Sequence, residues 1–133
     1  MEKIEYLNQA YRVDQRINSK IEQIKSLREL ATKATSTIVE DKVSSSSRYD
    51  KMENAIIKIV DLENEINEDI NDLVDLKVEV VKIIKEVKST EEQMLLELRY
   101  LCFKSWEQIA VEMNYTIRHV YRVRDQAIKN LKK

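Results

Sequence analysis

The chain has 133 residues, a formal net charge of −1, and neither glycine nor proline. Turns between β-strands depend on these two residue types, so the composition excludes a β-rich fold and predicts an all-α protein. It also excludes a glycine-rich phosphate-binding loop. The single cysteine, Cys102, excludes an intrachain disulfide, and we expect it to be a small buried apolar residue.

Charge is distributed unevenly along the chain. Residues 1–88 hold 15 basic and 18 acidic side chains, whereas residues 104–133 hold 7 basic and 3 acidic ones, a local net charge of +4. A basic C-terminal segment favours contact with nucleic acid at that end of the chain. The sequence shows no signal peptide and no run of 18 apolar residues, so we expect a cytoplasmic protein without membrane contact.

Two long helices are expected in residues 1–88, joined by a serine-rich linker at residues 35–49, because Ser and Thr compete for backbone hydrogen bonds. Apolar residues recur every seven positions in both segments, which predicts a coiled coil. The sequence leaves open whether the helices pair as a hairpin or between chains, and we expect a homodimer or a higher homo-oligomer. The repeat in the first helix, residues 2–34, is Ala10, Ile17, Ile24 and Ala31. The repeat in the second, residues 50–88, is Met52, Ile59, Ile66, Leu73, Val80 and Val87, with Ile70 among the companion positions.

The second long helix also carries an acidic run without an intervening basic residue: Asp61, Glu63, Glu65, Glu68, Asp69, Asp72 and Asp75. We interpret it as a solvated outer face. A di-metal site in a helical bundle would need Glu-x-x-His motifs, and the only histidine is His119. No nucleophile–base pair is recognisable either, so we expect no cofactor, no metal and no enzymatic activity.

Residues 89–133 are expected to form a separate DNA-binding domain. Ser89 and Glu92 have the spacing of a capping box, which predicts a helix over residues 89–103. Trp106 is the only tryptophan, and we expect it to anchor the core between this helix and the next one.

A helix-turn-helix is predicted directly after this helix. Ser105 and Gln108 form a second capping box, and the helix that they begin is followed by Asn114, a residue that tolerates positive φ. Thr116 is the expected N-cap of a longer helix that runs to the end of the chain.

This last helix has two faces, because its apolar residues recur at helical spacing. Arg118 and Arg122 lie opposite the apolar face, and Tyr121 lies on the flank. An apolar inner face with arginines outside is typical of a DNA recognition helix, and we expect these three residues to contact bases. The apolar face consists of Val120, Val123, Ala127 and Leu131. The expected phosphate contacts are Lys104, Ser105, Thr116, His119, Arg124, Lys129 and Lys132.

The C-terminal segment resembles two groups of bacterial and phage proteins. Residues 106–110 (WEQIA) and the spacing that follows resemble region 4 of bacterial sigma factors. Residues 98–101 (LRYL), 104–106 (KSW) and 120–122 (VYR) are similar to phage regulators of late transcription of the ArpU/RinA type. The sigma-like spacing is carried by Thr116, Val120, Val123, Ala127 and Leu131.

The resemblance covers residues 89–133. It implies a sequence-specific DNA-binding transcriptional regulator, encoded by a phage or prophage and active in the bacterial host cytoplasm, with double-stranded DNA and RNA polymerase as partners. The chain departs from the pattern at Asn114, where Gly is common, and at Ile117, where a polar residue is usual. The alternative is a coiled-coil interaction or scaffold protein whose C-terminal module binds a protein partner.

Overall fold

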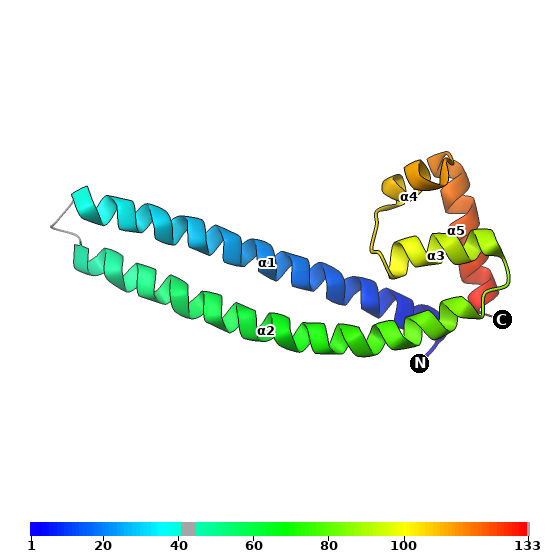
Figure 1. Cartoon of the computed structure of the whole chain (residues 1–133), viewed down its shortest axis with the longest axis horizontal. Helices are drawn as coiled ribbons and strands as arrows, with labels where there is room; N and C mark the ends of the chain where they lie inside the picture. The colour runs from blue at the N-terminus through cyan, green and yellow to red at the C-terminus, as the bar shows by residue number, and fades with distance from the viewer. Residues whose placement is uncertain (41–44, 133) are drawn as a thin grey trace. The chain divides into compact units, whose positions relative to one another are not determined.

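The computed structural model describes residues 1–40 and 45–132, with side chains except at residues 34–46 and 48. Every regular element in the described residues is a helix, which confirms the all-α class predicted from the absence of glycine and proline. The chain packs as two compact units, residues 15–71 and residues 1–14 together with 72–133. The helices, labelled in Figure 1, are α1 (Lys3–Glu40), α2 (Ser45–Lys85), α3 (Thr90–Tyr100), α4 (Trp106–Met113) and α5 (Ile117–Leu131).

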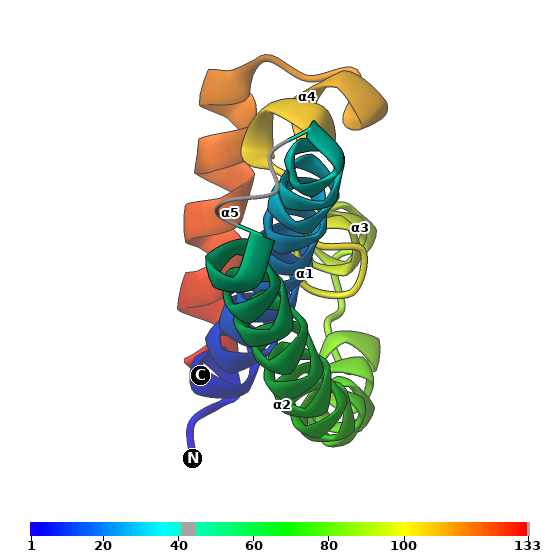
Figure 2. The ribbon, with the colours of Figure 1, turned by 90° about the vertical axis from the view of Figure 1, so that its left-hand side faces the viewer.

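Within residues 15–71, α1 and α2 lie side by side, as both Figure 1 and Figure 2 show. Arg16 is ion-paired with Asp69, whereas Arg28, further along α1, is ion-paired with Glu63, which comes earlier in α2. The two helices are therefore antiparallel, and the coiled-coil seam closes within the chain in this unit. Its buried apolar side chains are Ile17, Ile24, Ile59, Leu62 and Ile66.

The linker predicted at residues 35–49 is largely helical. Residues 35–40 belong to α1 and residues 45–49 belong to α2, while residues 41–44 lie outside the described residues. For residues 35–40 and 45–49 the prediction was wrong, because it rested on local propensity. Ser and Thr disfavour helix by only about 0.5 kcal/mol per residue relative to Ala, which a long neighbouring helix outweighs.

Asp69 corrects the prediction that the acidic run is entirely solvated. Its side chain is buried, with 7% of the residue exposed, and it accepts hydrogen bonds from Arg16 Nη2 at 3.0 Å and Lys20 Nζ at 2.8 Å. Ile70, which was expected on the seam, is 43% exposed instead. The hydrogen bond from Arg16 is the main cause that lowers the pKa of Asp69, with Lys20 acting in the same direction against the effect of burial. The other six acidic residues of the run are exposed.

The second unit has one apolar core to which all five helices contribute. Leu7 of α1 and Ile84 of α2 are fully buried together with Leu95 of α3. The unit therefore extends beyond residues 89–133, the segment expected to form the DNA-binding domain. From α4 and α5 the core receives Ile109, Ala110, Val120, Val123, Ala127 and Leu131.

Two details of α3 differ from expectation. Ser89 is its N-cap and accepts a hydrogen bond from the Glu92 backbone N–H, but the buried Glu92 carboxylate accepts from Asn130 Nδ2 at 2.6 Å, which ties the start of α3 to the end of α5. The helix ends at Tyr100 rather than at residue 103, and Phe103 has a positive φ of 56°. Cys102 therefore leaves the apolar face and is exposed, contrary to the prediction that it is buried.

Candidate nucleic-acid interface

The turn between α4 and α5 is built by three local capping devices. Ser105 and Gln108 exchange the two hydrogen bonds of a capping box at the start of α4, as predicted. Asn114 ends α4 in the left-handed conformation, with φ 59° and ψ 43°. The Thr116 hydroxyl oxygen accepts a hydrogen bond from the His119 backbone N–H at 3.1 Å and caps α5. The two helices and the tight turn expected between them are therefore present in the backbone.

Helix α5 buries one face and exposes two arginines on the other. Arg118 and Arg122 are both exposed, and within the described residues no hydrogen bond or ion pair engages either guanidinium. Their spacing of four residues places both on one side of the helix. Lys129 and Lys132 are also exposed. The opposite face, formed by Val120, Val123, Ala127 and Leu131, is buried.

Three of the expected phosphate contacts, Lys104, His119 and Arg124, have acidic partners within the fold. Lys104 Nζ is ion-paired with the Glu112 carboxylate. His119 Nε2 lies 3.8 Å from Glu91 Oε2, and its ring lies edge-on to that of Tyr115 with 4.4 Å between the centroids. The hydroxyls of Ser105 and Thr116 accept capping hydrogen bonds. The Glu112 carboxylate reduces the positive charge that Lys104 presents to an approaching phosphate, and the Glu91 carboxylate places a negative charge beside His119.

Tyr115 and Glu91 link the start of α3 to the turn before α5. The Tyr115 hydroxyl donates a hydrogen bond of 2.5 Å to Glu91 Oε2. This hydrogen bond to a carboxylate raises the pKa of Tyr115, and desolvation adds to the effect. The turn is thus fixed by a side-chain contact in addition to its caps.

A continuous aromatic–arginine stack runs through this unit. The guanidinium carbon of Arg99 lies 3.8 Å from the ring centroid of Tyr11 and 4.4 Å from that of Trp106. Arg124 continues the series, 5.6 Å from the Trp106 centroid and 4.7 Å from the Tyr121 centroid. The stack thereby joins α1, α3, α4 and α5, and it packs against the flank of the helix that carries the two exposed arginines.

The stack changes what can be expected of three predicted residues. Arg124, expected to contact phosphate, also forms an ion pair with Asp125 at 2.9 Å, so its guanidinium is already engaged. Tyr121, expected to contact bases, has one ring face covered by Arg124. Trp106 packs against the core as expected, and its ring also supports both arginines of the stack.

Sequence reasoning missed Arg99, Tyr11, Glu91 and Tyr115. Arg99 interrupts the apolar face of α3, and its Nη1 donates a hydrogen bond to the Lys104 carbonyl at 3.0 Å. An arginine within an otherwise apolar helical stripe is the only signal that pointed to such a role. Nothing in the local pattern indicates that Tyr11, from the first helix, would be its partner.

Comparison with protein families matches residues 30–132 to a family described as "Protein of unknown function (DUF1492)". Comparisons with curated proteins and with solved structures gave no match. In residues 1–40 and 45–132, none of the helices has the length and apolar character required to cross a bilayer. Because the family match extends over most of the chain and includes α3, α4 and α5, this protein belongs to the DUF1492 family.

Proposed function

We propose that this protein is a sequence-specific DNA-binding transcriptional regulator, and that α5 reads the DNA. The observation that carries the proposal is the exposure of Arg118 and Arg122, without intramolecular partners in the described residues, on the second helix of a helix-turn-helix. The resemblance of residues 89–133 to sigma region 4 and to ArpU/RinA-type regulators supports a phage or prophage origin, and contact with RNA polymerase is part of the same proposal.

In this proposal the N-terminal half of α5 enters the major groove. Arginine can donate two hydrogen bonds to the N7 and O6 atoms of guanine, so Arg118 and Arg122 are the base readers. Tyr121 lies between them in sequence, and the stacked Arg124 restricts its ring. A restricted side chain loses less conformational entropy on binding, which favours Tyr121 as a contact to a thymine methyl group or a neighbouring phosphate.

The phosphate contacts divide into two groups in this proposal. Lys129 and Lys132 are exposed and have no acidic partner within the described residues, so they would supply most of the salt-dependent affinity. Lys104 and His119 would first have to leave Glu112 and Glu91. We therefore expect each of them to contribute less than an unpaired side chain would.

The experiment that tests this function is selection of bound fragments from random duplex DNA with the full chain. The affinity of a selected fragment is then compared with that of random duplex, at low and at moderate salt. The proposal requires a preference for the selected fragment that survives at moderate salt, because nonspecific attraction falls steeply with ionic strength. If the protein shows no such preference, the proposed DNA-binding function is wrong.

A second candidate function is an interaction protein whose C-terminal module binds a protein partner. One observation favours it, the Val111 side chain of α4, which is 80% exposed. An exposed apolar side chain at this place offers a protein partner apolar surface that would be buried on binding. This candidate becomes the better one if the selection yields no preferred DNA.

We also propose that the chain forms a homodimer through its long helices. The seam of α1 and α2 is satisfied within the chain in residues 15–71, so a dimer must use another surface of these helices.

A further inference from the structure

One face of α2 carries large apolar side chains that α1 does not cover. Ile56 is 50% exposed, Val60 48% and Ile70 43%, although the adjacent seam is buried. By helical periodicity these three residues share one side of α2 with Glu63 and Asn67, at successive steps of three or four residues. We call this set, residues 56, 60, 63, 67 and 70, the α2 stripe.

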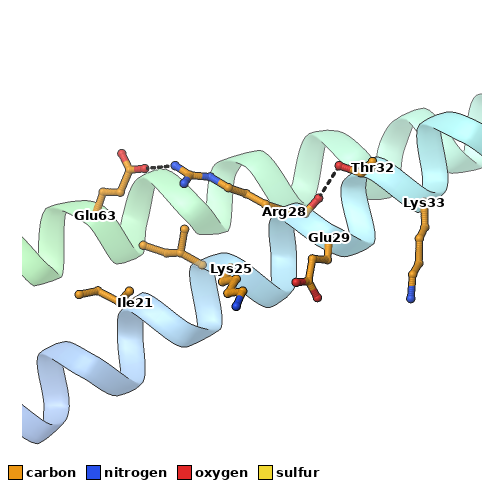
Figure 3. A pocket seen from close by; sticks show the side chains of 8 residues that line it. Ile21, Lys25, Arg28, Glu29, Thr32, Lys33 and Glu63 are labelled. Carbon is orange, nitrogen blue, oxygen red and sulfur yellow. Dashed lines mark hydrogen bonds and ion pairs between the residues drawn. The ribbon is translucent and has the colours of Figure 1, made fainter.

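A hollow of about 670 Å³ borders the α2 stripe at Glu63. Figure 3 shows Arg28 of α1 extending to Glu63, where the Arg28 Nη2 to Glu63 Oε1 distance is 3.0 Å. Ile21, half exposed, lies on the wall of the same hollow. Ile21 thus adds exposed apolar surface on α1 beside the hollow. Large exposed apolar patches mark interaction sites.

Four residues of the α2 stripe lie symmetrically about position 65 of the chain. Starting from Glu65, Glu63 and Asn67 lie two residues away on either side, and Val60 and Ile70 lie five residues away. Branched apolar residues therefore occupy equivalent positions in both directions along the helix.

This symmetry matches what a two-fold dimer requires. In such an interface, residue i of one copy contacts residue j of the other, and j contacts i in return. If two antiparallel α2 helices cross at Glu65, Val60 of each copy lies against Ile70 of the other. This contact therefore occurs twice in the dimer. The same crossing would also place Glu63 against Asn67 twice, and the asparagine amide N–H can donate to a carboxylate that already accepts from Arg28, because a carboxylate has several lone pairs.

We propose that the α2 stripe is the surface on which a second copy of this chain docks, with the two α2 helices antiparallel. A parallel arrangement would place Glu63 against Glu63, like charges that oppose association. The proposal rests on the homodimer proposed above and does not depend on DNA binding. It explains why Ile56, Val60 and Ile70 of the stripe, and Ile21 beside it, are each about half exposed in a single copy.

The test uses sedimentation equilibrium of the full chain with two single variants, Val60→Glu and Ile70→Lys. Each places a charge against an apolar side chain twice in the symmetric dimer, so each alone should weaken the dimer about tenfold or more. When the two variants are mixed, the new carboxylate faces the new ammonium across one contact, while the other contact is native. The mixture should therefore form heterodimers more tightly than either variant forms homodimers.

Ile57→Glu is the matched control, since Ile57 is 52% exposed but points about 100° away from Ile56 around the helix. It should leave the dimer unchanged, and circular dichroism should report the same helix content for all variants. A monomeric parent protein at tens of micromolar overturns both the dimer and this surface. A dimer that survives both single charges overturns the α2 stripe alone, and so does a dimer that Ile57→Glu dissociates. A mixture that stays dissociated overturns the antiparallel pairing. Failure of DNA binding affects none of these outcomes.

Discussion

Arg99 lies over the ring of Tyr11, with its guanidinium carbon 3.8 Å from the ring centroid, and so connects α3 to the first turns of α1. The other side of the same guanidinium faces Trp106 at 4.4 Å. A planar cation between two rings gains electrostatic attraction from both, and this geometry distinguishes arginine from lysine.

We therefore expect Arg99→Lys to lower the free energy of unfolding by about 1–2 kcal/mol, although it keeps the charge. The measurement is urea unfolding followed by the fluorescence of Trp106, the only tryptophan and a member of the stack. Arg12→Lys, which changes an exposed arginine of α1, is the matched control. Equal stability of the Arg99 and Arg12 variants would show that the stack contributes nothing.

Asp69 makes the stability of the α1–α2 hairpin dependent on pH. Its folded-state pKa is lowered from 3.8 because the carboxylate accepts a hydrogen bond from Arg16, with Lys20 as a second partner. A lowered folded-state pKa means that the stabilisation is fully present above the unfolded pKa and is lost as the pH falls through the folded pKa. Asp69→Asn should thus lower the free energy of unfolding at pH 7 by about 1–3 kcal/mol.

The same substitution should matter less below pH 4, where the carboxyl group of the parent protein becomes protonated in the unfolded state and then in the folded state. Urea unfolding of both proteins at pH 7 and pH 3 measures the difference. Glu68→Gln, at an exposed neighbour, controls for the change in net charge. A difference between parent and Asp69→Asn that is constant with pH would contradict the assigned ion pairs.

Asn114 occupies the left-handed region at the end of α4, with φ 59°. Residues with a Cβ are strained there by about 1–2 kcal/mol, whereas Gly is unstrained and Asn is tolerated. Asn114→Ala should therefore lower the midpoint of thermal unfolding, and Asn114→Gly should leave it unchanged or raise it. If the two variants unfold at the same temperature, the conformation assigned to this turn is wrong.

Base readout by α5 predicts different effects for arginines and lysines. Arg118→Ala and Arg122→Ala should each weaken binding to a selected DNA fragment by about 1–3 kcal/mol and affect random duplex much less. Lys132→Ala should weaken binding to all sequences alike and reduce the salt dependence by about one unit of log–log slope. Fluorescence anisotropy at several salt concentrations measures both effects.

Arg12→Ala is the control for the loss of one exposed arginine, since Arg12 lies on α1. If Arg118→Ala and Arg122→Ala both bind the selected fragment as tightly as this control, α5 is not the reading helix. The role of a protein-binding module would then account better for the C-terminal helices.

The amino-acid sequence by itself determined the helices and the turn at the candidate interface. Ser105, Thr116 and Asn114 act through hydrogen bonds and backbone angles within three or four residues of themselves. Their effect can therefore be predicted from a short stretch of sequence. The heptad seam through Ile59 and Ile66 can also be predicted from the sequence, because helical periodicity is a local property.

Only the tertiary structure determined which contacts the buried polar groups make and which cationic side chains remain available to bind a phosphate or a base. Asp69 lies seven residues after the buried Leu62 and therefore faces α1, whereas Ile70 does not. That Arg16 and Lys20 of α1 lie opposite Asp69 depends on the register between the helices, which is absent from the pattern of either one. Arg99 likewise finds Tyr11 only once α1 packs on α3. The ion pair that engages Lys104 forms only when the turn before α4 brings it to Glu112, and Arg124 stacks on Trp106 only when α4 packs beside α5. These tertiary contacts distinguish the two cations from the exposed arginines of α5.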